Sequence, residues 1–327
     1  MMNRILGRAA AAAVVLGLAG LAGPAMADDW PSRPLTLIVP FGPGSSPDTM
    51  ARIVAEHAGE TLGQTIVVQN RPGASGNLGT NAIAQSKPDG YTFGVSITGP
   101  MVNNTVLYAE LPYDPKKDLV PLTLAVHQFN VLAVAAESPY QNFEQLLAAM
   151  KDPANDFNFP STGAGTISHL SVELLLERTG GKAVHVAYNS SPAAVTSLIS
   201  QDTDFAALPP IAVMPMIRDG KLRPLAAVAS ERLSFLPEVP TVNEFGMENV
   251  EGSGWIGFVA PAGMPADIET RLADALIKAL HDPDLAERLR NLYMEPVGNT
   301  PEEFGRYMDE ELARWAPLIK RLKLSVN

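Results

Sequence analysis

Residues 35–46 (LTLIVPFGPGSS) form the first unit of the chain from which a fold can be argued. The apolar run Leu35–Val39 ends at a proline, which predicts a short buried strand. Ser46 can cap a helix N-terminus, Pro47 fits the first helical turn, and Asp48 suits the positive end of the helix dipole. The stretch therefore predicts a strand that passes through a glycine- and proline-rich loop into a helix.

The same order of elements continues along the chain. A strand at 65–69, a short helix at 78–85 and a strand at 91–97 complete a strand–helix–strand–helix–strand series, which is typical of a parallel sheet covered by helices. A second α/β unit follows, with strands expected at 131–135, 157–159, 184–187 and 225–229 and helices at 143–150, after 166 and at 193–200. A strand at 256–261 and three helices close the chain, the last opening on a capping box at 300–303.

Length and composition exclude several classes of protein. The 327 residues suggest two domains. Residues 1–27 hold two arginines and no acid, so the rest of the chain has 22 basic and 35 acidic residues and a formal charge of −13. That balance argues against nucleic acid or an anionic membrane as a partner. The chain has no cysteine, which excludes disulfides, thiolate metal sites, a cysteine nucleophile and a lipid-anchored cysteine.

The first 27 residues have the features of a secretory signal peptide. Arg4 and Arg8 precede the uncharged apolar run 9–21, and the small residues Ala25 and Ala27 provide a cleavage site before Asp28. A membrane anchor is the alternative, but the apolar core is short for one. We therefore expect an exported protein that is soluble after cleavage.

Familiar catalytic and cofactor motifs are absent or out of context. Residues 252–257 match G-x-G-x-x-G, but a strand rather than a helix follows. No pair among the five histidines has metalloprotease spacing, and no G-x-S-x-G elbow is present. We therefore expect no metal and no cofactor. An exported hydrolase with Ser45 or Ser161 as nucleophile stays open as an alternative, although no motif supplies its base.

Two similar loops give the strongest functional signal. Residues 44–46 and 161–166 each join a buried strand to a helix, and each offers small residues, hydroxyls, backbone N–H groups and a helix N-terminus. Such groups hold anions. Ordinary strand–helix turns would look alike, but two such loops in two α/β units suit a ligand clamped between lobes.

Many ordered motifs resemble those of a known family. They occur at 30–34, 38–41, 62–64, 67–74, 87–92, 111–115, 163–169, 185–188, 220–223, 236–241 and 260–263. From Trp30 to about Trp315 the chain resembles the substrate-binding proteins of tripartite tricarboxylate transporters, the Bug or TctC-like family.

The resemblance implies a fold and a function. The fold would be α/β, a two-lobed periplasmic binding protein of type II, with lobe 1 at 28–124 plus 251–327 and lobe 2 at 125–250. The protein would be non-catalytic, monomeric and periplasmic. It would capture a small carboxylate, such as a di- or tricarboxylate, between the lobes and deliver it to membrane transporter subunits or a sensor.

The resemblance also implies which residues face the ligand. The two loops would reach toward one carboxylate, partly through ordered water. Four departures from the family pattern lie near this pocket: Ser45 replaces a glycine, Pro47 lacks an N–H, Asn189 replaces a basic residue, and Thr203 stands where valine is usual. The expected ligand-binding residues are Phe41, Gly42, Gly44, Ser45, Ser46, Ser96, Thr98, Ser161, Thr162, Gly163, Ala164, Gly165, Thr166, His169, Tyr188, Asn189 and Asp204.

Overall fold

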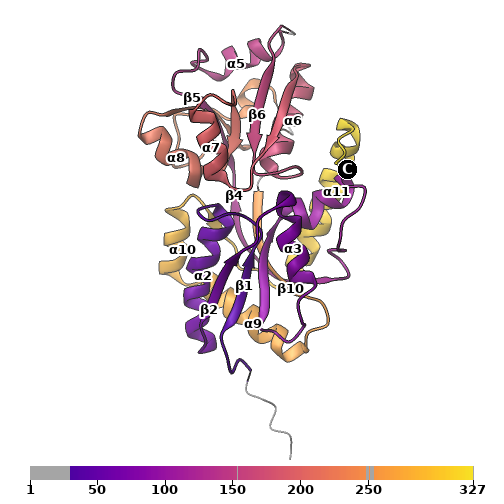
Figure 1. Cartoon of the computed structure of the whole chain (residues 1–327). Helices are drawn as coiled ribbons and strands as arrows, with labels where there is room; N and C mark the ends of the chain where they lie inside the picture. The colour runs from indigo at the N-terminus through magenta and orange to yellow at the C-terminus, as the bar shows by residue number, and fades with distance from the viewer. Residues whose placement is uncertain (1–29, 153, 248–249, 251–253, 327) are drawn as a thin grey trace, which may run out of the picture. The chain divides into compact units, whose positions relative to one another are not determined.

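The computed structural model describes residues 30–152, 154–247, 250 and 254–326 (Figure 1). The predicted signal peptide lies outside these residues. From Arg33 onward the chain forms one compact unit. Within the described residues, no helix has both the length and the apolar character needed to cross a membrane.

The first lobe is built on a six-stranded mixed sheet with the strand order β11-β4-β10-β3-β1-β2. Strand β1 pairs in parallel with β2 and β3, whereas β10 pairs antiparallel with both β3 and β4. The strands are β1 (Leu35–Val39), β2 (Ile66–Asn70), β3 (Thr92–Ile97), β4 (Leu119–Gln128), β10 (Gly254–Pro261) and β11 (Glu295–Pro296). The helices are α2 (Ser46–Leu62), α3 (Asn77–Ala84), α4 (Asn104–Leu107), α9 (Ala266–Leu280), α10 (Pro283–Arg290) and α11 (Pro301–Leu322), with short turns η1 (Ala74–Gly76) and η2 (Gly99–Asn103).

The second lobe contains a three-stranded antiparallel sheet, β8-β5-β9, and a parallel pair, β6-β7. The strands are β5 (Asn130–Ala135), β6 (Phe157–Ser161), β7 (Ala183–Ala187), β8 (Ala206–Leu208) and β9 (Leu222–Val228). The helices are α5 (Phe143–Met150), α6 (Ile167–Thr179), α7 (Ser191–Ile199) and α8 (Pro210–Arg218), with the short turn η3 (Val242–Phe245). The predicted α/β class is confirmed.

The first strand–loop–helix unit forms where the sequence predicts it. In β1 every residue except Thr36 is buried, and α2 begins at Ser46 with proline in its first turn. Helix α2 buries Met50 and Val54 against the sheet side and ends at Gly63, which adopts a left-handed conformation with φ 70°. Glycine is favoured at such a helix end because it has no Cβ to strain.

Helix α11, yellow in Figure 1, belongs to the cores of both lobes. Phe304, near its start, packs with Trp255 and Ile38 of the first lobe. Trp315 and Ile319, near its end, pack in the core that contains the buried face of α6. A single helix therefore ties the two cores together. The lobe boundaries expected from the resemblance stay a prediction.

Gly94 in β3 is a position where the fold requires a glycine. A Cβ at Gly94 would lie 2.7 Å from the carbonyl oxygen of Ile38 and 2.6 Å from Cγ1 of Ile83, so α3 could not pack so closely on the sheet. We expect Gly94→Ala to lower the free energy of unfolding by about 1–3 kcal/mol, the usual effect of overpacking. Urea denaturation measures this change.

Gly305 in α11 is the matched control for Gly94. A Cβ there meets only Cγ of Pro121, at the ordinary contact distance of 3.6 Å. Gly305→Ala should stabilise the protein by about 0.5–1 kcal/mol, because alanine is the better helix former. Equal stability of the two variants would contradict this account of the sheet packing.

Candidate functional site

A cavity of about 40 Å³ lies between residues of the two lobes. The first lobe and the connection out of it contribute Phe41, Ser45, Ser46, Pro47, Ile97, Thr98, Gln128, Gly254 and Trp255. The second lobe contributes Asn130, Thr162, Thr166, Ile167, Ser168, Ser191 and Pro209. The centre of one water molecule needs about 10–15 Å³ of such a volume, so the cavity has room for about three waters.

Four helix N-termini meet at this cavity. Ser45 and Ser46 begin α2, Thr166 caps α6, Ser191 is the first residue of α7, and Pro209 precedes α8. The first N–H groups of a helix have no partner within it, and each N-terminus carries roughly half a positive charge. This arrangement favours a bound anion.

The described residues that line the cavity include no aspartate, glutamate, lysine, arginine or histidine. The positive potential therefore comes from backbone dipoles and hydroxyl groups rather than from a cationic side chain. Since these dipoles are fixed by the fold, they need no rearrangement to face an anion.

Two buried hydroxyl groups in the cavity wall have no hydrogen-bond partner. Ser46 is 0% exposed and Thr98 is 1% exposed, and neither Oγ of Ser46 nor Oγ1 of Thr98 is bonded. The side-chain oxygen of Gln128 is also buried without a partner. Unpaired buried polar atoms are costly in a folded protein. Their presence at one cavity makes them candidates for hydrogen bonds to a ligand.

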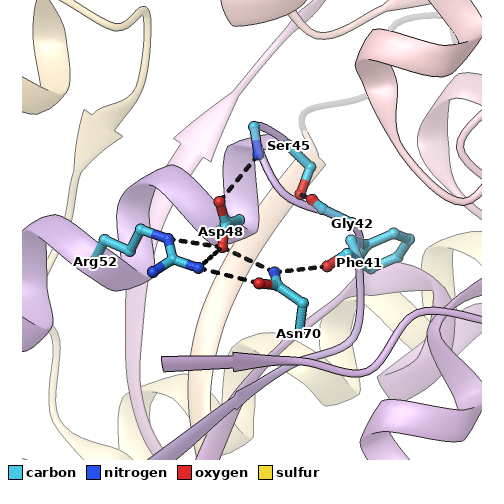
Figure 2. A network of polar contacts seen from close by, with 7 residues as sticks. Phe41, Gly42, Ser45, Asp48, Arg52 and Asn70 are labelled. Atoms are coloured by element: carbon cyan, nitrogen blue, oxygen red, sulfur yellow. Dashed lines mark hydrogen bonds and ion pairs between the residues drawn. The ribbon is translucent and has the colours of Figure 1, made fainter. Parts of the chain in front are cut away.

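The first loop is held in place by Asp48, which Figure 2 shows among its partners. Its carboxylate accepts hydrogen bonds from the Gly44 N–H (3.0 Å), Arg52 Nε (3.0 Å) and Asn70 Nδ2 (2.8 Å). Asn70 Nδ2 also donates to the carbonyl oxygen of Phe41, 2.9 Å away. Burial alone would raise the pKa of Asp48, but the hydrogen bonds from Arg52, Asn70 and Gly44 outweigh burial and hold this pKa below its usual value. The negative charge of Asp48 is thus balanced by Arg52, and the hydrogen bonds of this carboxylate hold the first loop in place.

The second loop is braced from behind by two histidines. Ser161 Oγ lies 2.5 Å from Nε2 of His185 and accepts the Gly163 N–H at 2.9 Å. Nδ1 of His169 accepts the Gly165 N–H at 3.1 Å, and the two imidazole rings stack 4.0 Å apart. Burial, together with nearby His169, lowers the pKa of His185 to about 3. His185 is therefore neutral at pH 7 and can accept the Ser161 hydroxyl hydrogen.

The two lobes touch at both loops. The Gly42 N–H donates to the carbonyl oxygen of Asn189 at 3.0 Å, and Asn103 Nδ2 donates to the carbonyl oxygen of Gly165 at 2.7 Å. A Cβ at Gly165, where φ is 79°, would collide with Oδ1 of Asn104. The second loop therefore needs glycine to approach the first lobe this closely.

The structure divides the expected ligand-binding residues into three groups. Six line the cavity: Phe41, Ser45, Ser46, Thr98, Thr162 and Thr166. Seven shape the loops or the contact between lobes: Gly42, Gly44, Ser161, Gly163, Gly165, His169 and Asn189.

The third group lies away from the cavity. Ser96 Oγ is bonded to Oγ1 of Thr80 at 3.0 Å. Tyr188 packs on the core of the second lobe, and Ala164 belongs to the core that holds α6. Asp204 accepts the Asn158 N–H at 2.7 Å and braces β6.

Several lining residues were not expected from the sequence. Ser191 could have been found, because Ser190, Ser191 and Pro192 together have the pattern of a helix start, which the prediction placed at 193. Pro209 could have been found only by predicting α8, and the apolar spacing of this helix is interrupted by Pro215. Gln128 and Asn130 flank the connection from β4 to β5 and carry no motif.

A hydrolase is poorly supported by this geometry. Ser161 is 0% exposed and is absent from the cavity wall, so its contact with His185 cannot reach a substrate there. Ser45 does line the cavity, but its hydroxyl donates to the carbonyl oxygen of Gly42 at 2.7 Å. Among the described residues, no group of three or more potential ligands could hold a metal ion.

Comparisons with known proteins agree with the fold. Residues 50–324 match the model of the TctC family, described as the tripartite tricarboxylate transporter family receptor. The chain belongs to this family. Its fold is that of a two-lobed periplasmic binding protein, as the structural neighbours show.

Three of the similar solved structures illustrate the degree of similarity. The periplasmic binding protein BugD is 30% identical with a TM-score of 0.86, over 90% of this chain and 99% of that chain. Rpa4515 of R. palustris, solved with adipate, has the same identity, TM-score and coverage. MatC (Rpa3494) from Rhodopseudomonas palustris, solved with bound malate, is 28% identical with a TM-score of 0.83, over 89% of this chain and all of that chain.

Removing the unpaired hydroxyls should not destabilise the protein. We expect Ser46→Ala and Thr98→Val to leave the free energy of unfolding unchanged or higher, because no hydrogen bond is lost. Ser161→Ala should lower it by about 1–3 kcal/mol, since Gly163 and His185 each lose a partner. Chemical denaturation of the three variants checks both statements. A large loss of stability in Ser46→Ala would contradict the assignment of an unpaired hydroxyl.

His185 should make the fold less stable in acid. Its pKa is 6.5 ordinarily but about 3 in the fold. Below pH 6.5 the unfolded chain therefore binds a proton that the folded chain does not, and the free energy of unfolding falls as the pH falls. His185→Gln can still accept a hydrogen bond from Ser161. In this variant the free energy of unfolding should depend less on pH between about pH 3 and pH 6.5.

The comparison between His185→Gln and the parent chain isolates this one group. Burial also lowers the pKa of His127, which makes the fold less stable in acid, as for His185. Burial raises the pKa of Glu311, which makes the fold more stable in acid. Both groups are the same in the two proteins. Parallel pH profiles of stability for the variant and the parent would show that His185 is not the titrating group.

Proposed function

We propose that the protein is an exported periplasmic solute-binding protein that closes its two lobes on a small carboxylate, such as a di- or tricarboxylate. The observation that carries this proposal is the meeting of four helix N-termini from both lobes at one cavity whose described lining residues carry no charged side chain. Adipate in Rpa4515 and malate in MatC are ligands of the same chemistry.

The proposed mechanism is hinge closure. The cavity is lined by both lobes, so the lobes must part for a ligand to enter, and they must then close around a space wider than the present cavity of about 40 Å³, which is too small for a four-carbon acid. The closed state is favoured because only then do donors of both lobes face the same anion. The hydrogen bonds from Gly42 to Asn189 and from Asn103 to Gly165 form part of the closed interface.

In this proposal the lobes are 28–124 plus 251–327 and 125–250, with α11 linking their cores, and the protein acts as a monomer. The partner would be the membrane subunits of a tripartite tricarboxylate-type transporter. A sensor is the other possible recipient of the loaded protein. Ligand-dependent uptake by vesicles that contain the transporter subunits would support the first partner, and uptake that is independent of this protein would oppose it.

Carboxylates should stabilise the protein, and their uncharged amides should not. Backbone donors at a helix N-terminus repay the desolvation of a full negative charge but gain less from a neutral amide. A ligand at one hundred times its dissociation constant adds about 2.7 kcal/mol to the free energy of unfolding. That corresponds to a rise of several degrees at roughly 2–4 °C per kcal/mol.

The test is a thermal-shift screen of succinate, malate, adipate and citrate beside succinamide, adipamide and neutral sugars. The double variant Ser46→Ala/Thr98→Val is the matched control, because it should fold normally yet show a smaller shift with the same acid. A shift produced only by a sugar or a cation would contradict the carboxylate assignment.

A further inference from the structure

A further contact between the lobes lies outside the ligand cavity, at Tyr293. This residue follows α10 in the first lobe, and its ring centroid lies 4.5 Å from that of Phe235 in the second lobe. Arg218, the last residue of α8, donates a hydrogen bond from Nη2 to the Tyr293 hydroxyl. The Tyr293 ring also packs against the second-lobe core that contains Leu233 and Leu236. One side chain of the first lobe is thus held by several groups of the second.

The backbone at Tyr293 has a conformation that a bulky residue rarely adopts. Its φ is 64°. The Tyr293 N–H donates to the carbonyl oxygen of Arg290 at 2.8 Å, and the Met294 N–H donates to that of Leu289 at 3.0 Å. These two bonds form the Schellman ending of a helix, in which the left-handed position is usually glycine because a Cβ is strained there. Tyrosine therefore strains the end of α10 where glycine would not.

The strain at Tyr293 is compensated by contacts with the other lobe. Strained residues persist where the surrounding structure holds them, and they are common at switch regions. Tyr293 and Phe235 line one groove together with Gln128, and Gln128 also lines the ligand cavity. The connection from β4 to β5 therefore runs between the ligand cavity and the Tyr293 contact. A rotation of the lobes about this connection changes both.

We propose that Tyr293 is a latch, whose contacts with Phe235 and Arg218 hold the lobes closed and so raise the affinity for a ligand that Tyr293 does not touch. The proposal rests on the proposed function, because it requires a ligand that is bound by closure. Tyr293 is not among the residues that line the cavity. Apparent affinity scales with the fraction of the protein in the binding-competent state, so the latch acts equally on every ligand.

The first experiment removes the ring and keeps the helix ending. Glycine relaxes the left-handed backbone, so purified Tyr293→Gly should still show a cooperative thermal unfolding transition. Titration calorimetry with malate, adipate and citrate measures the affinities. Each acid that the parent chain binds should bind the variant more weakly, by roughly fivefold or more and by similar factors. Unchanged or tighter binding of these acids would overturn the latch.

Lys323 provides the matched control for backbone strain. It ends α11 in the same left-handed conformation, with φ 53°, its N–H donates to the carbonyl oxygen of Lys320, and it is exposed. Lys323→Gly relaxes the same kind of helix ending and should leave the affinities unchanged. An equal loss of affinity in Lys323→Gly would assign the effect to helix endings in general and overturn the role of the Tyr293 contact.

Two further variants test the hydrogen bond of the latch. Tyr293→Phe keeps the ring against Phe235 but removes the hydroxyl, and Arg218→Met removes the donor. Each should weaken binding by less than Tyr293→Gly does. Because both variants break the same bond, the double variant should bind as the single variants do. Fully additive losses would overturn the contribution of this bond.

Small-angle X-ray scattering without ligand tests the latch independently of the ligand's identity. Ligand-free Tyr293→Gly should have a larger radius of gyration than the ligand-free parent, because more of its molecules are open. Equal radii would overturn the latch, whatever acids the protein binds. A larger radius in the variant, combined with no binding of any carboxylate by the parent, would support the latch and contradict the proposed carboxylate ligand.

Discussion

A buried carboxylate must have hydrogen-bond donors on several sides, and in the proposed function those donors are backbone groups of two separate lobes. The first turns of α2 on one lobe and of α6, α7 and α8 on the other face one small cavity. Neither lobe alone surrounds an anion. In the proposed mechanism, binding and closure are one event, because the full set of donors exists only when the lobes meet.

This arrangement works only if both loops are rigid before the ligand arrives. The first loop is fixed by Asp48 with Arg52 and Asn70, and the second by Ser161 with His185 and by Gly165 with His169. The polar atoms of these side chains form hydrogen bonds within the loops. The hydroxyls of Ser46 and Thr98 at the cavity have no such partner. Counted without residues 1–27, the chain has a formal charge of −13 and repels anions at long range. Salt screens that repulsion over about 10 Å, so the local donors dominate inside a closed cleft.

Local signals made much of the fold predictable. The strand at 35–39 and the helix that starts at Ser46 follow from a proline, a capping serine and apolar spacing, all of which lie within a few residues. Both loops were found in the same way. Helix α8 and strand β4 were not predicted, because prolines interrupt their apolar patterns at Pro215 and Pro121.

The site was less predictable than the fold. The family resemblance implies that Ser161 and Asp204 face the ligand, but their side chains bond instead to His185 and to the N–H of Asn158. Gln128 and Gly254 come together only because β4 and β10 pair across a long stretch of chain.

The most direct test of the account is a crystal structure with a bound carboxylate such as adipate. The account predicts carboxylate oxygens within about 3 Å of first-turn N–H groups of α2 and α6. A carboxylate paired with an arginine or lysine side chain outside this cavity would contradict it.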